Sequence, residues 1–513
     1  MDSIDDSIIS EANNDLTIDQ QHTKASRLRW WVLLTVIVGT FLGRLDQTIV
    51  NLALPKIISD FGITVSAAGW IATAYILANA IFVPIWGKLG DTIGRKKVYI
   101  LGFSIFIAGS VLAGLAWNLT SMISFRVIQA IAGSADYPTA MAILAVTFPD
   151  QKERAQALGI WSSSFAAAAV FGPLLGGPLI DHFGWRSVFL VNLPVGIVGL
   201  FMAITFVKES VSEKKTMHFD WWGAITLGMA LTALTLVLDQ GTEWGWMSLN
   251  AWLCYAAMFI FTAVFVRIEH SSPEPIVDLK FFRIPAFVNT LWNNFIVFMG
   301  MMGGVFLIPI FAQTFLGYSA TQSGYLFIPM AAALMLAAPL GGALTGRVKP
   351  NYVIMASTFV AGLGIYLFSH LDPKSTALDI IWPLAIMAFG LGFGMAQRTN
   401  IVASVVPVHE IGVASSILAL VRNIAGAFGI ALFGTILTNV TNHNVLVYGQ
   451  HSILQSLNPI DYQKFLGLII LKAQISAYGT VFLVASILIF IGAVLAYWIQ
   501  VENERTDIKV HVE

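Results

Sequence analysis

The chain of 513 residues is 57% hydrophobic and only 11% charged, with a formal net charge of -1 and a single cysteine. Soluble globular domains average about 25% charged residues, so this composition excludes a soluble globular protein and indicates one that crosses the membrane repeatedly. The near-neutral charge gives no information about nucleic-acid binding, and no basic tract suggests it. The single cysteine excludes an intramolecular disulfide.

The chain begins with a polar segment, residues 1–28, which we expect to form a cytoplasmic tail. A membrane-spanning helix needs about 20 largely apolar residues, and fourteen such runs follow this segment. The sequence therefore predicts an all-α polytopic membrane protein that ends in a second cytoplasmic tail, residues 501–513. The expected spans are 30–52, 68–87, 98–117, 120–146, 155–179, 187–207, 220–238, 250–267, 286–313, 322–345, 351–370, 380–403, 410–437 and 475–499.

Basic residues are distributed unevenly between the two sides of the membrane that this alternation defines. With the N-terminus placed inside, most of the 28 Lys and Arg residues fall in cytoplasmic segments. The outer segments hold only Lys56, Arg186, Lys374, Lys464 and Lys472. Because cytoplasmic loops of membrane proteins are enriched in Lys and Arg, we expect both termini to be cytoplasmic.

A few ionisable residues interrupt the apolar runs, most visibly in FLGRLDQTIVNLALP at residues 41–55. A charge at the centre of a membrane-spanning helix costs at least about 2.5–3.5 kcal/mol, so such a residue usually faces a partner or a wet cavity. The alternative to a functional role is a structural ion pair that holds two helices together. The residues concerned are Arg44, Asp46, Arg126, Asp136, Arg398 and Arg422.

Helical rise places Asp46 and Arg126 at the same depth, each about six residues or ~9 Å below the outer end of its predicted helix. We therefore expect them to pair, with Gln129 on the same face as Arg126. Asp136 lies ~15 Å deeper. Arg44 is about 200° from Asp46 around the helix and cannot share its face, so the sequence leaves Arg44 without an assigned partner.

Carboxylates within membrane-spanning helices can carry protons. A carboxylate in a cavity that opens alternately to the two sides binds a proton in one environment and releases it in the other. We therefore predict that Asp46 and Asp136, with Arg126 beside Asp46, couple proton movement to the movement of a cargo.

The segment GKLGDTIGRKK, residues 87–97, lies in the predicted cytoplasmic loop between the second and third helices. Its glycines permit a tight turn, and its charged residues form charge-assisted hydrogen bonds. The segment resembles the signature loop of the major facilitator superfamily, with Gly87, Asp91, Gly94 and Arg95 in register. This resemblance implies a loop that latches the two halves of the protein on the inner side.

The segment GIWSSSFAAAAVFGPLLGG, residues 159–177, lies in the predicted fifth helix. Small residues let helices approach closely, and proline bends a helix by removing a backbone donor. The segment is similar to the antiporter motif of the same superfamily, which marks exporters that exchange cargo for protons. The matching residues are Gly159, Gly172, Pro173, Gly176 and Gly177, whereas Ala168 replaces a usual glycine.

Two further motifs carry the resemblance. RVIQAIAGS, residues 126–134, resembles the fourth-helix motif associated with proton transfer, with alanine at two usual glycine positions. LDQTIVNLALP, residues 45–55, resembles the first-helix motif of the fourteen-helix drug:proton antiporters, although Arg44 stands where an apolar residue is usual. The matching residues are Arg126 and Gln129 in the first motif, and Asp46, Thr48, Asn51 and Pro55 in the second.

The resemblance covers nearly the whole chain and implies the major facilitator fold. Two six-helix bundles are expected at residues 29–210 and 271–500, with two inserted helices in 211–270 and a long outer loop at 439–474. By analogy, cargo binds near the midplane between the first and fourth helices of the two bundles. The residues expected in this cavity are Gln129, Tyr137, Asn289, Asn293, Phe298 and Arg398.

The function implied is a proton-coupled antiporter of the multidrug efflux type, which exports small lipophilic or amphipathic compounds from the cell by alternating access. Its expected partners are these compounds, protons and membrane lipid. We expect it to need no cofactor or metal. It is expected to act as a monomer, with an adaptor protein as an alternative arrangement. Two alternatives stay open, a dedicated exporter of one metabolite, antibiotic or lipid and a non-transporting membrane sensor. An enzyme is not predicted, since no metal-ligand cluster, nucleophile elbow or phosphate-binding loop stands out.

Overall fold

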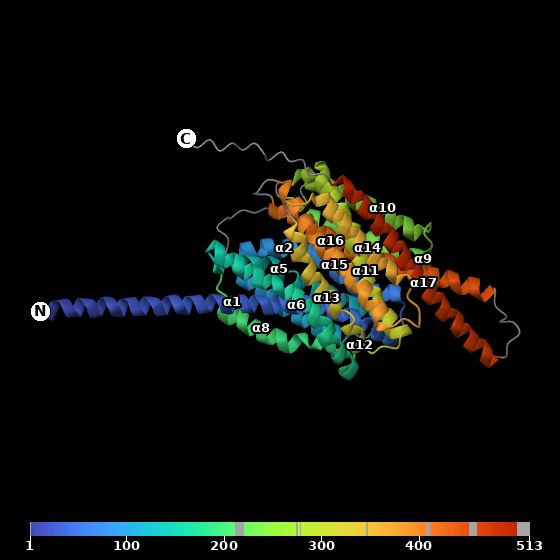
Figure 1. Cartoon of the computed structure of the whole chain (residues 1–513), viewed down its shortest axis with the longest axis horizontal. Coiled ribbons are helices and arrows are strands. Elements are labelled where there is room, and N and C mark those ends of the chain that lie inside the picture. The colour runs from blue at the N-terminus through green and yellow to red at the C-terminus, as the bar shows by residue number, and fades with distance from the viewer. Residues whose placement is uncertain are drawn as a thin grey trace.

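The computed structural model of the protein describes residues 2–210, 220–272, 275–277, 279–344, 347–406, 411–450 and 459–499. Within these ranges the chain forms helices and no strand. Figure 1 shows a bundle of helices from which the first part of α1 extends as a single rod.

Many helices begin at a polar side chain that accepts a hydrogen bond from the first turn, as at Thr64, Asn118, Ser248 and Ser319. Such caps satisfy backbone N–H groups that have no partner within the helix. The helices are α1 (Asp2–Phe61), α2 (Val65–Ile93), α3 (Arg95–Gly114), α4 (Leu119–Gly133), α5 (Asp136–Thr147), α6 (Gln151–Phe183), α7 (Ser187–Leu190), α8 (Asn192–Phe206), α9 (Trp221–Trp244), α10 (Leu249–Ser271), η1 (Leu279–Arg283), α11 (Pro285–Phe315), α12 (Ala320–Tyr325), α13 (Ile328–Ala343), α14 (Pro350–Phe368), α15 (Ala377–Ser404), α16 (Ile411–Gln450), α17 (Pro459–Leu495) and η4 (Ala496–Trp498).

Each predicted span coincides with one helix or with two successive helices. Among the described residues, 12 helical stretches are long and apolar enough to cross a membrane by length and composition. The predicted spans outside this set are 120–146, which forms α4 and α5, and 155–179, which lies within α6. The all-α membrane fold is thereby confirmed, and the number of fourteen crossings stays a prediction.

The predicted fourth span is broken in its middle, between Gly133 and Asp136. Pro138 has no N–H to donate to the carbonyl of Ser134, four residues earlier, so the regular ladder is interrupted there. The break makes Asp136 the first residue of α5. A helix N-terminus favours a negative charge, so the interruption itself creates a suitable place for this carboxylate.

The segments predicted as a cytoplasmic tail and an outer loop are largely helical. The backbone of α1 starts at Asp2 and runs through most of the predicted tail. Most of the predicted 439–474 loop belongs to the end of α16 and the start of α17. These two ends protrude from the bundle on the side opposite the rod of α1 (Figure 1). Residues 2–28 and 439–450 contain no proline, so their polar composition marks the end of an apolar run rather than the end of a helix.

The chain divides into an N-terminal half, α1 to α8, and a C-terminal half, α11 to α17, with α9 and α10 beside them. α9 packs on α2 and α16, whereas α10 packs chiefly on α9. An apolar groove of about 630 Å³ runs between α2, α9 and α10.

The largest apolar cluster joins the two halves of the protein toward one end of the bundle. Following the predicted orientation, we name the end that carries Gly94 the inner end and the end that carries Asp181 the outer end. The largest buried cluster lies toward the outer end and mixes residues of both halves, such as Leu52 of α1 and Phe306 of α11. Toward the inner end, a cluster around Tyr99 contains residues of the N-terminal half alone. The described structure is therefore closed at its outer end.

Candidate transport site

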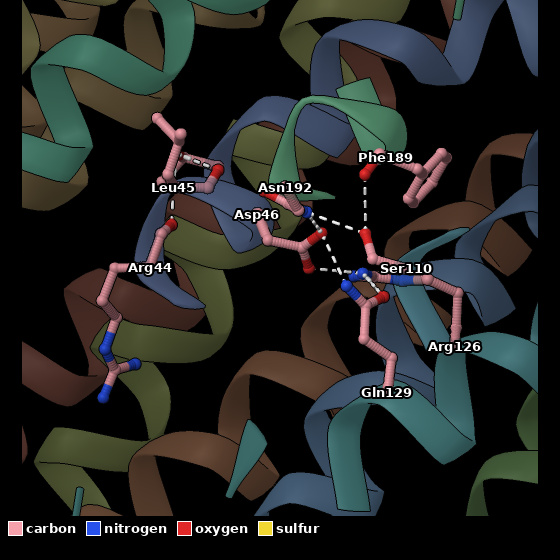
Figure 2. Close-up of polar contacts among 9 residues, drawn as sticks. Arg44, Leu45, Asp46, Ser110, Arg126, Gln129, Phe189 and Asn192 are labelled. Atoms are coloured by element: carbon pink, nitrogen blue, oxygen red, sulfur yellow. Dashed lines mark hydrogen bonds and ion pairs between the residues drawn. The ribbon is translucent and has the colours of Figure 1, made fainter. Parts of the chain in front are cut away.

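Asp46 of α1 is fully buried and accepts hydrogen bonds from side chains on two other helices. Arg126 Nη1 of α4 donates to Oδ2 at 2.5 Å, while Gln129 Nε2 of α4 and Asn192 Nδ2 of α8 each donate to Oδ1 at 3.0 Å. Figure 2 shows these groups converging on the carboxylate. The predicted pairing of Asp46 with Arg126 is confirmed, and Gln129 joins it as expected.

Further contacts hold this network in place. The Arg126 guanidinium donates to Gln129 Oε1 at 2.7 Å and lies over the ring of Tyr75, 4.0 Å from its centroid. Asn192 Nδ2 also donates to Ser110 Oγ of α3 at 2.8 Å. The network thus ties α1, α3, α4 and α8 together. Sequence reasoning missed Asn192 and Ser110 because a neutral polar residue in an apolar helix does not show which neighbour it contacts.

Asp136 belongs to a separate polar site. Its Oδ2 accepts a hydrogen bond from Thr40 Oγ1 at 2.7 Å, and Trp161 Nε1 donates to the same hydroxyl at 2.9 Å. Its Oδ1 has no hydrogen-bond partner among the described residues and borders a void of about 20 Å³ beside Gly39 and Tyr99. Asp136 therefore keeps an acceptor atom that the surrounding helices do not use.

Arg44 interacts electrostatically with Asp136. Its side chain points away from the Asp46 network (Figure 2), and its Nη1 donates to Gln47 Oε1 at 3.1 Å. Its charge interacts with that of Asp136 and with the hydroxyl of Tyr137. The N-terminal half thus contains the ion pair of Asp46 with Arg126 and, apart from it, the opposite charges of Asp136 and Arg44, which interact electrostatically.

The 87–97 segment makes a turn at the inner end that docks within its own half. Gly94 separates α2 from α3 with a φ of 116°. The Glu209 carboxylate, just after α8, accepts hydrogen bonds from the backbone N–H groups of Lys96 at 3.1 Å and Lys97 at 3.3 Å. Glu209 therefore caps α3, which the sequence did not reveal. Asp91 lies in the last turn of α2, and its side chain is outside the described part of the structure.

Gly94→Ala is expected to destabilise this turn. A β-carbon at position 94 would meet the Glu209 carboxylate at 2.5 Å, and positive φ costs a non-glycine residue roughly 1–3 kcal/mol. Thermal unfolding of the purified protein in detergent should show a lower Tm. Gly467→Ala is the matched control, since a β-carbon there has nothing within 4 Å. Equal Tm values for the two variants would contradict this account.

The antiporter motif packs α6 against α1. A β-carbon at Gly172 would collide with Thr48, and one at Gly176 would collide with Ile49. Thr48 Oγ1 also donates to the carbonyl of Ala168 at 3.3 Å. The first-helix motif and the antiporter motif are thus two sides of one interface. Gly159 lies in α6, but its immediate surroundings are outside the described part of the structure.

The same motif continues across the boundary between the halves. A β-carbon at Gly177 would collide with the backbone of Thr321 in α12, and one at Gly324 would collide with the carbonyl of Pro173. Glycine is required at 177 and 324 because two backbones touch there.

Asp181, close to the end of α6, adds a polar contact at this boundary. Its carboxylate accepts the N–H groups of Ala320 at 3.1 Å and Thr321 at 2.9 Å, which start α12. Burial acts to raise the pKa of Asp181, but the hydrogen bonds from Thr321 and Ala320 outweigh it and hold that pKa below its ordinary value. Asp181 therefore stays ionised at neutral pH and favours closure of the outer end.

Comparison with known proteins places this arrangement in a family. Residues 36–430 match the model of the Major Facilitator Superfamily. The chain belongs to the Major Facilitator Superfamily. This transporter is 32% identical over 408 residues to the multidrug resistance protein Stp of Mycobacterium tuberculosis, which covers 79% of this chain and 76% of Stp.

Two other proteins are informative. The tetracenomycin C resistance and export protein of Streptomyces glaucescens is 30% identical over 82% of the transporter and 78% of its own length. The crystal structure of a bacterial homologue of the human lysosomal transporter Spinster superposes with a TM-score of 0.68 at 16% identity, covering 93% of the transporter and 99% of that chain. Fold and family together identify a multi-pass membrane transporter of small substrates.

The residues predicted to line the substrate cavity occupy different places in the transporter. Gln129 belongs to the Asp46 network, and Asn293 and Arg398 are buried inside the C-terminal half. Asn289 donates to the carbonyl of Trp498 at 3.0 Å, near the inner end. The remaining two are exposed or partly exposed: Tyr137 at 43% of its surface, and Phe298 beneath Arg422.

Proposed function

We propose that this transporter exports small lipophilic or amphipathic compounds across the cell membrane in exchange for protons, as a monomer with both termini in the cytoplasm. The observation that carries the proposal is the buried Asp46 carboxylate bonded to Arg126, Gln129 and Asn192. The name of Stp, a multidrug resistance protein, supports the cargo class.

The network supplies a physical basis for coupling. Protonation of Asp46 would remove the charge that Arg126 pairs with and leave the buried guanidinium bonded only to neutral oxygens, which weakens the pairing. This loss favours a rearrangement of α1, α4 and α8 that rehydrates or re-pairs the arginine. Proton binding and helix rearrangement are therefore linked at this one site.

The closed outer end supplies the second element of the cycle. Apolar packing, the Gly177 and Gly324 contacts, and the Asp181 cap all join the halves at that end. Alternating access requires these contacts to break while others form at the inner end.

The test is proton flux in liposomes that contain the purified transporter and an imposed pH gradient. Several unrelated lipophilic compounds from a panel of cations, anions and neutral molecules should each dissipate the gradient. A single active compound would instead support a dedicated exporter, which the name of the tetracenomycin C relative also illustrates. No active compound, with intact folding, would favour the non-transporting sensor.

Asp136→Asn tests the second carboxylate. We expect transport to persist and its rate to depend less on pH, because one titrating group is removed while the Asp46 network is intact. The measurement is initial transport rate against pH in the same liposomes. Superimposable profiles for wild type and variant would leave Asp136 with a packing role.

A further inference from the structure

The C-terminal half contains a buried arginine that has no carboxylate partner among the described residues. Arg398 of α15 is fully buried; its Nε donates to Asn293 Oδ1 at 2.7 Å and its Nη2 to Thr358 Oγ1 at 2.9 Å. These groups lie on the first, third and fourth helices of their half, as Asp46, Ser110 and Arg126 do in the other half. An amide therefore takes the role that a carboxylate has in the N-terminal half.

Two donors near this arginine are unsatisfied. Arg398 Nη1 and Asn294 Nδ2 are buried without a hydrogen-bond partner among the described residues. A buried donor that is left unpaired is unfavourable, and an unpaired charge is more so. Both atoms call for an acceptor that the described helices do not provide.

Arg422 of α16 adds a second positive charge at this place. It interacts electrostatically with Arg398. Its Nε reaches Asn294 Oδ1 at 3.4 Å and its Nη2 reaches Thr399 Oγ1 at 3.5 Å, both long contacts to neutral oxygens. Within the described part of the chain, neither Arg398 nor Arg422 forms an ion pair with a carboxylate.

Arg422 lies within electrostatic reach of the N-terminal half. Its charge interacts with the hydroxyl of Tyr137, which lies on α5 and is 43% exposed. Helical rise puts Arg422 about 16 Å, and Tyr137 about 15 Å, from the inner ends of their helices. The two residues are therefore level, on opposite sides of the boundary along which cargo would pass.

Arg422 also affects which ligands can bind to the ring of Phe298. Its guanidinium lies over the ring of Phe298, 5.1 Å from the centroid. One face of Phe298 is thus already occupied by a cation, which makes that face a poor site for a second one. The apolar edge of the ring remains available next to the guanidinium.

We propose that the cargo is an anionic amphipath, whose carboxylate, phosphate or sulfonate binds Arg422, with Arg398 and Asn294 behind it, while its apolar part lies against Phe298 and Tyr137. This inference rests on the proposed export function and narrows its substrate class. An anionic group compensates both arginines and supplies the acceptor that the two buried donors lack.

The test compares binding of 2-naphthoate and its uncharged isostere 2-naphthamide to the full-length protein in lipid nanodiscs, by titration calorimetry. The carboxylate should bind at least ~10-fold more tightly, in line with the strength of charge-assisted hydrogen bonds. Arg422→Gln should abolish this preference, and Arg422→Lys should keep most of it. Asn293→Asp, which places a carboxylate beside Arg398, should weaken the preference.

Arg186→Gln is the control for the loss of an arginine, since Arg186 lies at the outer end near Asp60. It should bind both ligands as the wild type does. Equal affinities for the two ligands, no binding of either, or a preference that survives Arg422→Gln would overturn the inference. Inorganic phosphate that binds at Arg422 while 2-naphthoate does not would also overturn it, because the site would then serve a free anion. Proton flux driven by the whole panel of lipophilic cations, anions and neutral compounds measures the export function separately, so a failure of the anion preference can be distinguished from a failure of export.

Discussion

Replacement of Asp46 by asparagine is expected to abolish proton-coupled export while leaving the protein inserted and folded. The variant removes the only acid in the buried network of Arg126, Gln129 and Asn192, so no proton is taken up or released there. Substrate-driven proton flux in liposomes should fall to the level of protein-free liposomes. Breaking a buried ion pair typically costs about 3–5 kcal/mol, which raises the question of whether the variant folds.

The C-terminal half indicates that Asp46→Asn can fold, because it already contains a buried arginine hydrogen-bonded to an asparagine. Arg398 is bonded to Asn293 there without any carboxylate partner among the described residues. In Asp46→Asn the new amide would retain a carbonyl oxygen for Arg126, so we expect a loss below the full cost of an orphaned charge. Near-wild-type expression and a monodisperse elution profile should accompany the lost flux. Normal proton flux in Asp46→Asn would contradict the coupling role.

Gly177→Val is expected to open the outer end. The added side chain collides with the backbone of Thr321, which belongs to the other half. Overpacking of this kind costs typically 1–3 kcal/mol, and because only the closed state suffers, the equilibrium between closed and open should shift by roughly 5–150-fold. Transport should slow, since the cycle must pass through the closed state.

The shift is measured by the rate at which a membrane-impermeant maleimide labels a reporter cysteine at the outer interface. Ser66→Cys serves this purpose, because position 66 faces Gly434 across the boundary, with Cys254→Ser removing the native thiol. Labelling should be faster in Gly177→Val than in the parent. Gly467→Val, with open space around it, should leave the rate unchanged. A Gly177→Val rate equal to the parent would show that the contact does not control closure.

Much of the fold was predictable because it rests on local properties of the chain. Apolar runs of the length needed to cross the bilayer, separated by polar and basic segments, predicted where helices lie, and each predicted span coincides with one helix or two successive helices. Depth along a helix follows from rise per residue alone, which is why the Asp46–Arg126 pairing was predicted correctly. The polar composition of the tail and the outer loop did not indicate a helix, although most of both segments is helical in the described residues.

Partners across helices were not predictable, because they depend on how helices rotate and tilt against one another. Asn192, Ser110 and Glu209 are ordinary polar residues in the sequence and become network members only through packing. The same holds for Asp181, whose contact lies about 140 residues further along the chain.

The sequence by itself determined that the protein crosses the membrane many times, which family it resembles, and which ionisable residues lie within apolar helices. These properties follow from composition, periodicity and spacing. Only the tertiary structure decided which charges are compensated. It paired Asp46 with Arg126 and set Arg44 near Asp136, yet left Arg398 and Arg422 without a carboxylate among the described residues. Electrostatic energy depends on distance and burial in space, and neither quantity is written in the order of residues along the chain.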